Sequence, residues 1–211
     1  MRLDKRQLTL YAITNRNWLN NSTMENDVEK ALRAGVTILQ IREKNITEEE
    51  YIERTQSLKK ITEKFNVPLI VNDNIEVAIK SGADGVHLGQ DDINSLSIRE
   101  RIGEKMILGV SAHNVEEAKK AEEMGANYLG VGAVFSTSTK NDAENIPFGT
   151  LKEICDTVSI PVVAIGGITK ENIKGLIGSG ISGISVISAI FAEKDIEKAT
   201  KEIKEEINKI L

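Results

Sequence analysis

The chain has 211 residues and a formal net charge of −5, with 27 basic and 32 acidic residues spread along its length. No basic block is present, which argues against nucleic acid and anionic membranes as partners. No apolar run approaches the ~20 residues of a membrane span, and the first residues lack the apolar core of a signal peptide, so we expect a cytoplasmic protein. The single cysteine, Cys155, excludes an internal disulfide and a cysteine-rich zinc site.

Eight short apolar runs alternate with amphipathic helical patterns, and no change of composition marks a second domain. Such alternation is typical of strand–helix units and a parallel sheet. The strands are predicted at residues 8–14, 37–42, 69–73, 85–89, 106–111, 128–133, 162–167 and 183–188. The helices are predicted at residues 25–34, 47–66, 76–81, 97–102, 115–124, 148–158, 170–179 and 194–211. Thr47 is expected to cap the second helix, with Glu50 completing a capping box.

Eight such units predict an α/β fold, namely a single (β/α)₈ TIM barrel that forms one domain over residues 1–211. An open doubly wound sheet is the second choice, because it usually has fewer strands. Barrel enzymes carry their chemistry on the loops that follow the strands, so polar residues at the carboxyl ends of the predicted strands are the candidates for function. The sequence does not determine the oligomeric state, and a homo-oligomer stays open.

The second predicted strand leads into residues 40–44, Gln-Ile-Arg-Glu-Lys. Alternation along an extended chain places Gln40, Arg42 and Lys44 on one side. A planar guanidinium and a mobile ammonium together suit a diphosphate better than a single carboxylate. The alternative is a solvated pair of charges at a strand end, which is a common arrangement.

The third and fourth predicted strands deliver acidic residues to the same rim. Asn72 and Asp73 end the third strand, and Asp91 and Asp92 follow the fourth. Beside a diphosphate, such carboxylates are typical ligands of Mg²⁺, which takes one or two carboxylates plus phosphate oxygens. Ion pairs with the neighbouring cations are the alternative, and the spacing does not decide between the two adjacent aspartates.

The remaining polar residues near the rim have two interpretations each. His87 lies inside the fourth strand and is interpreted as a packed, hydrogen-bonded residue rather than a functional one. Ser111, at the end of the fifth strand, is either a polar contact to a substrate or the N-cap of the next helix. His113 has the chemistry of an acid or base.

The last strands indicate a second anion site. Gly166 and Gly167 end the seventh strand and Ser188 ends the eighth, and the loops after these two strands are the recurrent phosphate site of barrels. Turn geometry alone is the alternative reason for the glycines. Residues 136–140, Ser-Thr-Ser-Thr-Lys, follow the sixth strand and lie between the two anion sites in barrel order. We therefore predict that Thr137, Ser138, Thr139 and Lys140 contact both.

These motifs together resemble those of the thiamine phosphate synthase family. The resemblance extends over nearly the whole chain, and its most specific parts are residues 40–44, 72–73, 85–92 and 136–140. Members of that family join the diphosphate of a hydroxymethylpyrimidine to a thiazole phosphate, which gives thiamine phosphate and releases diphosphate. The resemblance thus implies a Mg²⁺-dependent transferase of thiamine biosynthesis whose partners are two small phosphorylated substrates.

The resemblance also implies a role for each matching residue. The group that would hold the pyrimidine diphosphate consists of Gln40, Ile41, Arg42, Glu43, Lys44, Asn72, Ser111 and Lys140. Within it, the catalytic residues that would stabilise the departing diphosphate are Arg42, Lys44, Ser111 and Lys140. The Mg²⁺ ligands would be Asp73 and Asp92. The group that would receive the thiazole phosphate consists of Thr137, Ser138, Thr139, Gly167, Ile187 and Ser188.

The match departs from the family pattern in two places. Asn74 stands where an arginine commonly follows Asn-Asp, and Ser136-Thr137 replaces a more usual Pro-Thr or Thr-Pro pair. Two rival functions also stay open: a thiazole tautomerase of the same barrel family with His113 as acid–base, and a sensor that binds phosphorylated ligands without turnover. A tautomerase has no diphosphate to hold, so the two cations and two carboxylates of the rim argue against it.

Overall fold

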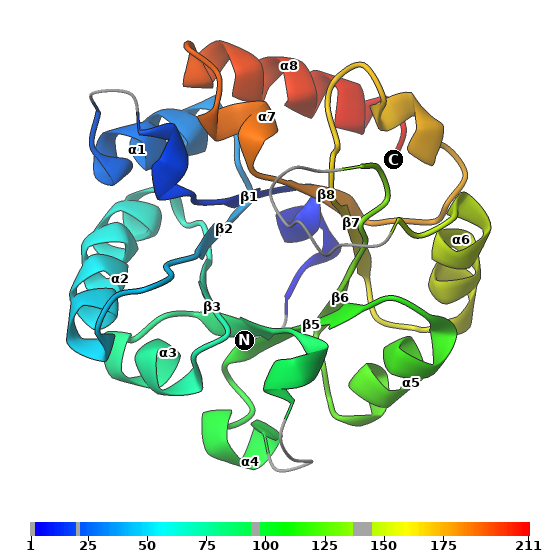
Figure 1. Ribbon diagram of the computed structural model, residues 1–211, viewed down its shortest axis with the longest axis horizontal. Helices are drawn as coiled ribbons and strands as arrows, with labels where there is room; N and C mark the ends of the chain where they lie inside the picture. The colour runs from blue at the N-terminus through cyan, green and yellow to red at the C-terminus, as the bar shows by residue number, and fades with distance from the viewer. Residues whose placement is uncertain (1–2, 20–21, 94–97, 137–144) are drawn as a thin grey trace.

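The computed structural model describes residues 3–19, 22–93, 98–136 and 145–211. The described residues form eight strands that close into a parallel barrel in chain order, with β1 paired to both β2 and β8 (Figure 1). The strands are β1 (Leu10–Ile13), β2 (Ile38–Ile41), β3 (Leu69–Asn72), β4 (Gly85–Leu88), β5 (Ile107–Ala112), β6 (Tyr128–Val131), β7 (Val162–Ile165) and β8 (Gly183–Val186).

A ring of helices surrounds this barrel (Figure 1). The α-helices are α1 (Met24–Ala34), α2 (Glu48–Thr62), α3 (Ile75–Ser81), α4 (Ile98–Ile102), α5 (Val115–Glu123), α6 (Phe148–Thr157), α7 (Ser188–Phe191) and α8 (Ile196–Asn208). Short 3₁₀ turns are η1 (Lys5–Leu8), η2 (Arg16–Trp18), η3 (Glu63–Phe65), η4 (Gln90–Asp92) and η5 (Ile173–Leu176). Within the described residues, no helix is long and apolar enough to cross a membrane.

The predicted (β/α)₈ barrel is confirmed, and each of the eight predicted strands is present. Seven of them are somewhat shorter than predicted, and β5 keeps the predicted length but starts one residue later. The predicted helix at residues 170–179 is wrong, because only the four-residue turn η5 forms there. Gly178 follows this turn with a left-handed φ of 78°, and Gly180 has a φ of 87°, so the backbone leaves the helical region. A short helix that was not predicted, α7, starts directly after β8.

Two layers of apolar side chains hold the barrel together. The larger layer lies between the strands and the helices, and it includes Leu39, Val86 and Leu129. The smaller layer fills the barrel interior and includes Ile38, Ile70 and Ile107. Because the strands are packed on both faces, polar groups that enter the interior must find partners there or open onto a cavity.

The start of α2 shows how local chemistry sets the position of a rim loop. The Thr47 side chain accepts a hydrogen bond from the Glu50 N–H at 3.2 Å, so the predicted cap is confirmed. The Glu50 carboxylate does not complete a capping box and instead pairs with Arg54 one turn later. The cap ends the loop that carries Arg42 and Lys44 from β2 to α2.

Candidate active site

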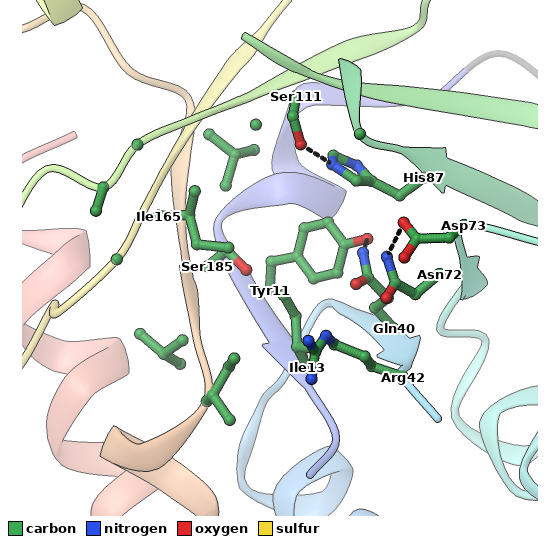
Figure 2. Close-up of a pocket in the computed structure, with 18 of the residues that line it drawn as sticks. Tyr11, Ile13, Gln40, Arg42, Asn72, Asp73, His87, Ser111, Ile165 and Ser185 are labelled. Carbon is green, nitrogen blue, oxygen red and sulfur yellow. Dashed lines mark hydrogen bonds between the residues drawn. The ribbon is translucent and has the colours of Figure 1, made fainter. Parts of the chain in front are cut away.

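A cavity of about 350 Å³ opens at the carboxyl ends of the strands. Each of the eight strands contributes at least one residue to its lining, and the loops after β2, β3, β4, β5, β6, β7 and β8 supply the rest. Figure 2 shows the ring of Tyr11 in the middle of this cavity, with Gln40 and Asn72 on one side and Ile165 and Ser185 on the other. The position is the one at which barrel enzymes bind their ligands.

A chain of hydrogen bonds crosses the floor of this cavity and joins five strands. Gln40 Nε2 donates to the Tyr11 hydroxyl at 2.8 Å, and the Tyr11 and Tyr128 hydroxyls are 2.8 Å apart. Tyr128 Oη is 3.0 Å from His87 Nδ1, and His87 Nε2 is 3.0 Å from Ser111 Oγ (Figure 2 draws the first and last of these bonds). Burial raises the pKa of both tyrosines far above the ordinary value, so their hydroxyls stay protonated.

Two glycines make room for this chain. A Cβ at Gly109 of β5 would lie 2.2 Å from the Tyr128 ring and 2.5 Å from His87 Nδ1. A Cβ at Gly130 of β6 would lie 3.0 Å from the His87 ring. Both rings therefore fit into the barrel interior only because the strands beside them carry no side chain at these positions.

One side of the cavity carries the predicted cations. Arg42 lines the cavity, and its guanidinium forms no ion pair with any described residue. Lys44 Nζ lies 2.7 Å from Asp73 Oδ2, so its ammonium is paired. The predicted placement of these two cations on the side of Gln40 is consistent with the structure. Lys44 does not itself line the cavity, but it pairs with Asp73, which does.

The two predicted metal ligands lie next to each other. Asp73 has a left-handed φ of 64°, and its other carboxylate oxygen accepts a hydrogen bond from Asn72 Nδ2 at 2.6 Å (Figure 2). Burial and the neighbouring charge of Asp73 raise the pKa of Asp92, while the Gly89 N–H and the Lys44 charge oppose this rise. Asp91 lines the same rim but is exposed. Among the described side chains, no group of three or more histidines, cysteines or carboxylates is arranged to hold a metal ion.

Two residues of the 40–44 motif turn away from the cavity. Ile41 is fully buried in the layer between barrel and helices, and its carbonyl accepts a hydrogen bond from the Tyr51 hydroxyl. The Glu43 carboxylate, only 3% exposed, pairs with Arg16 at 2.8 Å and Arg54 at 2.9 Å. Neither residue lines the cavity, so any part they take in substrate binding stays a prediction.

The opposite side of the cavity is formed by backbone. Gly166 and Gly167 have left-handed φ values of 102° and 61°, and a Cβ at Gly167 would lie 2.3 Å from the Ser136 carbonyl oxygen. Ile187 and Ser188 line the same side, at the start of α7. These residues after β7 and β8 lie where barrel enzymes bind a phosphate group.

The remaining predicted residues have mixed outcomes. Ser111 is not a helix cap, because Asn114 caps α5, and its hydroxyl instead bonds to His87. His87 is hydrogen-bonded inside the barrel as interpreted, yet it also lines the cavity. His113 is exposed and pairs with Glu117 at 2.9 Å. The residues Thr137, Ser138, Thr139 and Lys140 lie outside the described part of the chain.

Several lining residues were not predicted from the sequence. Tyr11 and Ser185 face the interior from within β1 and β8, and Tyr128 faces it from the first residue of β6. The Ser185 hydroxyl is buried without a hydrogen-bond partner among the described residues. Their apolar neighbours made each strand appear uniformly buried. The signal that identifies them is alternation, since they occupy inward positions on β1, β6 and β8.

The fold and the cavity define the class of the protein. A (β/α)₈ barrel with a cation and carboxylate side and a glycine side at its open end is a barrel enzyme for phosphorylated small molecules.

Comparison with known proteins identifies the family. The sequence matches the family model TMP-TENI, thiamine monophosphate synthase, over residues 10–190. It is 46% identical over 207 residues to the thiamine-phosphate synthase of Clostridium botulinum (strain Eklund 17B / Type B), covering 98% of this chain and 97% of that protein. It is 47% identical over 199 residues to that of Methanobrevibacter smithii, covering 94% and 95%. A solved thiamine phosphate pyrophosphorylase from Pyrococcus furiosus has a TM-score of 0.89 and 38% identity, covering 98% of both chains.

The chain therefore belongs to the thiamine monophosphate synthase family. This confirms the resemblance that the sequence motifs indicated, and with it the prediction of a transferase of thiamine biosynthesis.

Proposed function

We propose that the cavity joins 4-amino-5-hydroxymethyl-2-methylpyrimidine diphosphate to hydroxyethylthiazole phosphate, giving thiamine phosphate and diphosphate. The observation that carries the proposal is the presence of two different anion sites in one cavity of about 350 Å³. One is the side of Arg42, Lys44 and two carboxylates, and the other is the glycine backbone after β7 with the start of α7. Two phosphorylated substrates need two such sites.

Arg42 and Lys44 are proposed to hold the diphosphate. Because Arg42 has no partner among the described residues, binding an anion breaks no existing ion pair of its guanidinium. Its planar fork suits two phosphate oxygens. Lys140 would add a third cation from the loop after β6. Asn72 and Ser111 line the same side and supply hydrogen-bond donors.

The carboxylate pair fits Mg²⁺. Asp73 and Asp92 lie close enough for the charge of one to raise the pKa of the other, which is a repulsion that a divalent cation between them would relieve. Two protein carboxylates are also typical for Mg²⁺, which keeps its other positions for water and phosphate oxygens. When bound there, Mg²⁺ would offset the negative charge that develops on the leaving diphosphate.

The reaction itself needs little from the side chains beyond positioning and charge. The bond between the methylene carbon and the diphosphate oxygen breaks with its electron pair on oxygen, and the thiazole nitrogen lone pair forms the new carbon–nitrogen bond. No proton moves, so no general base is needed. The cations stabilise the departing oxygen, and the aminopyrimidine ring stabilises positive charge on the carbon.

The thiazole phosphate is proposed to bind at the glycine side. The left-handed backbone of Gly166 and Gly167 allows close approach, and Ile187 and Ser188 lie beside it. The predicted contacts of Thr137, Ser138 and Thr139 belong to this site. This arrangement places the nucleophile opposite the leaving diphosphate across the cavity.

The test is incubation of the protein with both substrates and Mg²⁺, followed by measurement of diphosphate and thiamine phosphate. Equal amounts of both products support the proposal, and chelation of Mg²⁺ should stop their formation. An isomerised thiazole without diphosphate would indicate the tautomerase, and binding without any product would indicate the sensor. A cytoplasmic location and a homo-oligomer stay predictions, which cell fractionation and sedimentation can test.

A further inference from the structure

The hydrogen-bond chain on the cavity floor has two ends that face the ligand. Gln40 and Ser111 both line the cavity, and three buried or half-buried residues, Tyr11, Tyr128 and His87, connect them. Each connecting hydroxyl has one proton and lies between two hydrogen-bond partners. The protons along the chain are therefore not independent of one another.

The orientation of the Gln40 amide determines the direction of the whole chain. Gln40 Nε2 donates to Tyr11, so the Tyr11 proton is available for the Tyr128 oxygen. Tyr128 then donates to His87 Nδ1, which leaves the ring proton on Nε2, directed at Ser111 Oγ. Ser111 accepts this bond, and its own proton remains for the cavity.

With the Gln40 amide in the orientation of the structure, other arrangements of the protons leave a buried proton without an acceptor. If His87 carried a proton on Nδ1, Tyr128 would have to donate to Tyr11, and the Tyr11 hydroxyl would then accept from both sides. Its own proton would have no partner in this chain, although Tyr11 is only 2% exposed. An unpaired buried donor is costly, so the fully paired direction is favoured.

We propose that this buried chain fixes the hydrogen-bond polarity of the substrate site, with Gln40 Oε1 presented as an acceptor and the Ser111 hydroxyl as a donor. Tyr11, Tyr128 and His87 act as positioning residues. The ligand chemistry that matches is a ring with an amino group facing Gln40 and an anionic oxygen facing Ser111. This assignment rests on the proposed function, since an aminopyrimidine diphosphate carries both groups.

Substrate selectivity tests the positioning role. The wild type should bind the aminopyrimidine diphosphate more tightly than its 4-oxo analogue, in which a carbonyl acceptor replaces the amino donor. In Tyr128→Phe, the Tyr11 hydroxyl loses its acceptor and can donate to Gln40 Oε1, so the amide can turn and present its NH₂ group. The ratio of the two dissociation constants, measured by calorimetry, should fall about tenfold or more.

A matched control is Tyr51→Phe. The Tyr51 hydroxyl is also buried, bonds to the Ile41 carbonyl at 2.9 Å and the Asn72 carbonyl at 3.2 Å, and lies outside both the chain and the cavity lining. This variant should lose stability but keep the wild-type ratio. Equal ratios in Tyr128→Phe and Tyr51→Phe would overturn the proposal.

The direction of the chain can be measured without any substrate. The protein has two histidines, so His113→Gln leaves His87 as the only imidazole signal. Nitrogen-15 NMR of the ligand-free variant should show His87 protonated on Nε2 and unprotonated on Nδ1. A proton on Nδ1 would contradict the proposal. If the expected tautomer and the selectivity change are observed but no thiamine phosphate forms, the chain is supported and only the proposed function fails.

Discussion

Arg42 and Arg54 are arginines close to the same strand end, and the structure predicts opposite effects of removing them. Arg42 lines the cavity and has no ion-pair partner among the described residues. Arg54 is turned away from the cavity and pairs with the buried Glu43 at 2.9 Å and with Glu50. Arg42→Ala should therefore reduce catalysis without reducing stability, and Arg54→Ala should do the reverse.

The magnitudes follow from these contacts. Loss of one donor that stabilises developing charge costs about 10²- to 10³-fold in rate, or about 2.7–4.1 kcal/mol. Arg42 is half-buried at the cavity and has no ion pair among the described residues, so its removal should change the free energy of unfolding by at most about 0.5 kcal/mol. In Arg54→Ala the Glu43 carboxylate, 3% exposed, keeps only Arg16 as a partner. A weakened buried charge of this kind costs about 1–3 kcal/mol.

The assays are steady-state release of diphosphate and urea unfolding of each ligand-free variant. The expected result is a low kcat/KM with unchanged stability for Arg42→Ala, and a near-normal kcat/KM with reduced stability for Arg54→Ala. Normal turnover of Arg42→Ala would refute the placement of the diphosphate. Unfolding of Arg42→Ala at a lower urea concentration than the wild type would refute the conclusion that the Arg42 guanidinium contributes little to stability.

Three further substitutions test other parts of the cavity. Asp92→Asn should raise the stability of the Mg²⁺-free protein near neutral pH and weaken Mg²⁺ binding. The folded protein raises the pKa of Asp92, so ionisation of this carboxyl disfavours folding. The wild type should therefore lose stability as pH rises through that pKa, whereas the variant should not. Gly109→Ala should cost about 1–3 kcal/mol in urea unfolding, because its Cβ would lie 2.2 Å from the Tyr128 ring. Ser185→Ala should leave the melting temperature of the ligand-free protein unchanged or higher, because the hydroxyl it removes is buried without a hydrogen-bond partner among the described residues.

The rim of the site was predictable from the sequence because its residues follow the strands directly. Once the strands were located, the carboxyl-end rule identified Arg42, Asn72, Asp73 and Ser188, and all four line the cavity. The sequence next to each strand is sufficient to find these residues, since each one is positioned by the strand that it follows. The predicted helix at residues 170–179, which does not form, illustrates the limit: its apolar spacing is helical, while Gly178 near its end and Gly180 just after it adopt left-handed φ values.

The floor of the site was not predictable in the same way. The Tyr11 and Tyr128 hydroxyls meet at 2.8 Å although 117 positions separate them in the sequence. Their contact depends on barrel closure and on the register of β1 and β6, which no local pattern encodes. His87 was correctly interpreted as a hydrogen-bonded interior residue, but its hydrogen bonds to Ser111 of β5 and Tyr128 of β6 depend on how the barrel brings these strands together.

The rim and the floor prepare for substrate by different physical means. On the floor, the buried hydroxyls of Tyr11 and Tyr128 are paired before the ligand arrives, so the ends of the chain, at Gln40 and Ser111, remain to bind it. At the rim, water can solvate a charge, so the Arg42 guanidinium can stay unpaired at little cost. The floor thus contributes preorganised hydrogen bonds that recognise a ring, and the rim contributes positive charge that stabilises the departing diphosphate. A site that must both select a base and release a diphosphate needs the two at different depths of one barrel.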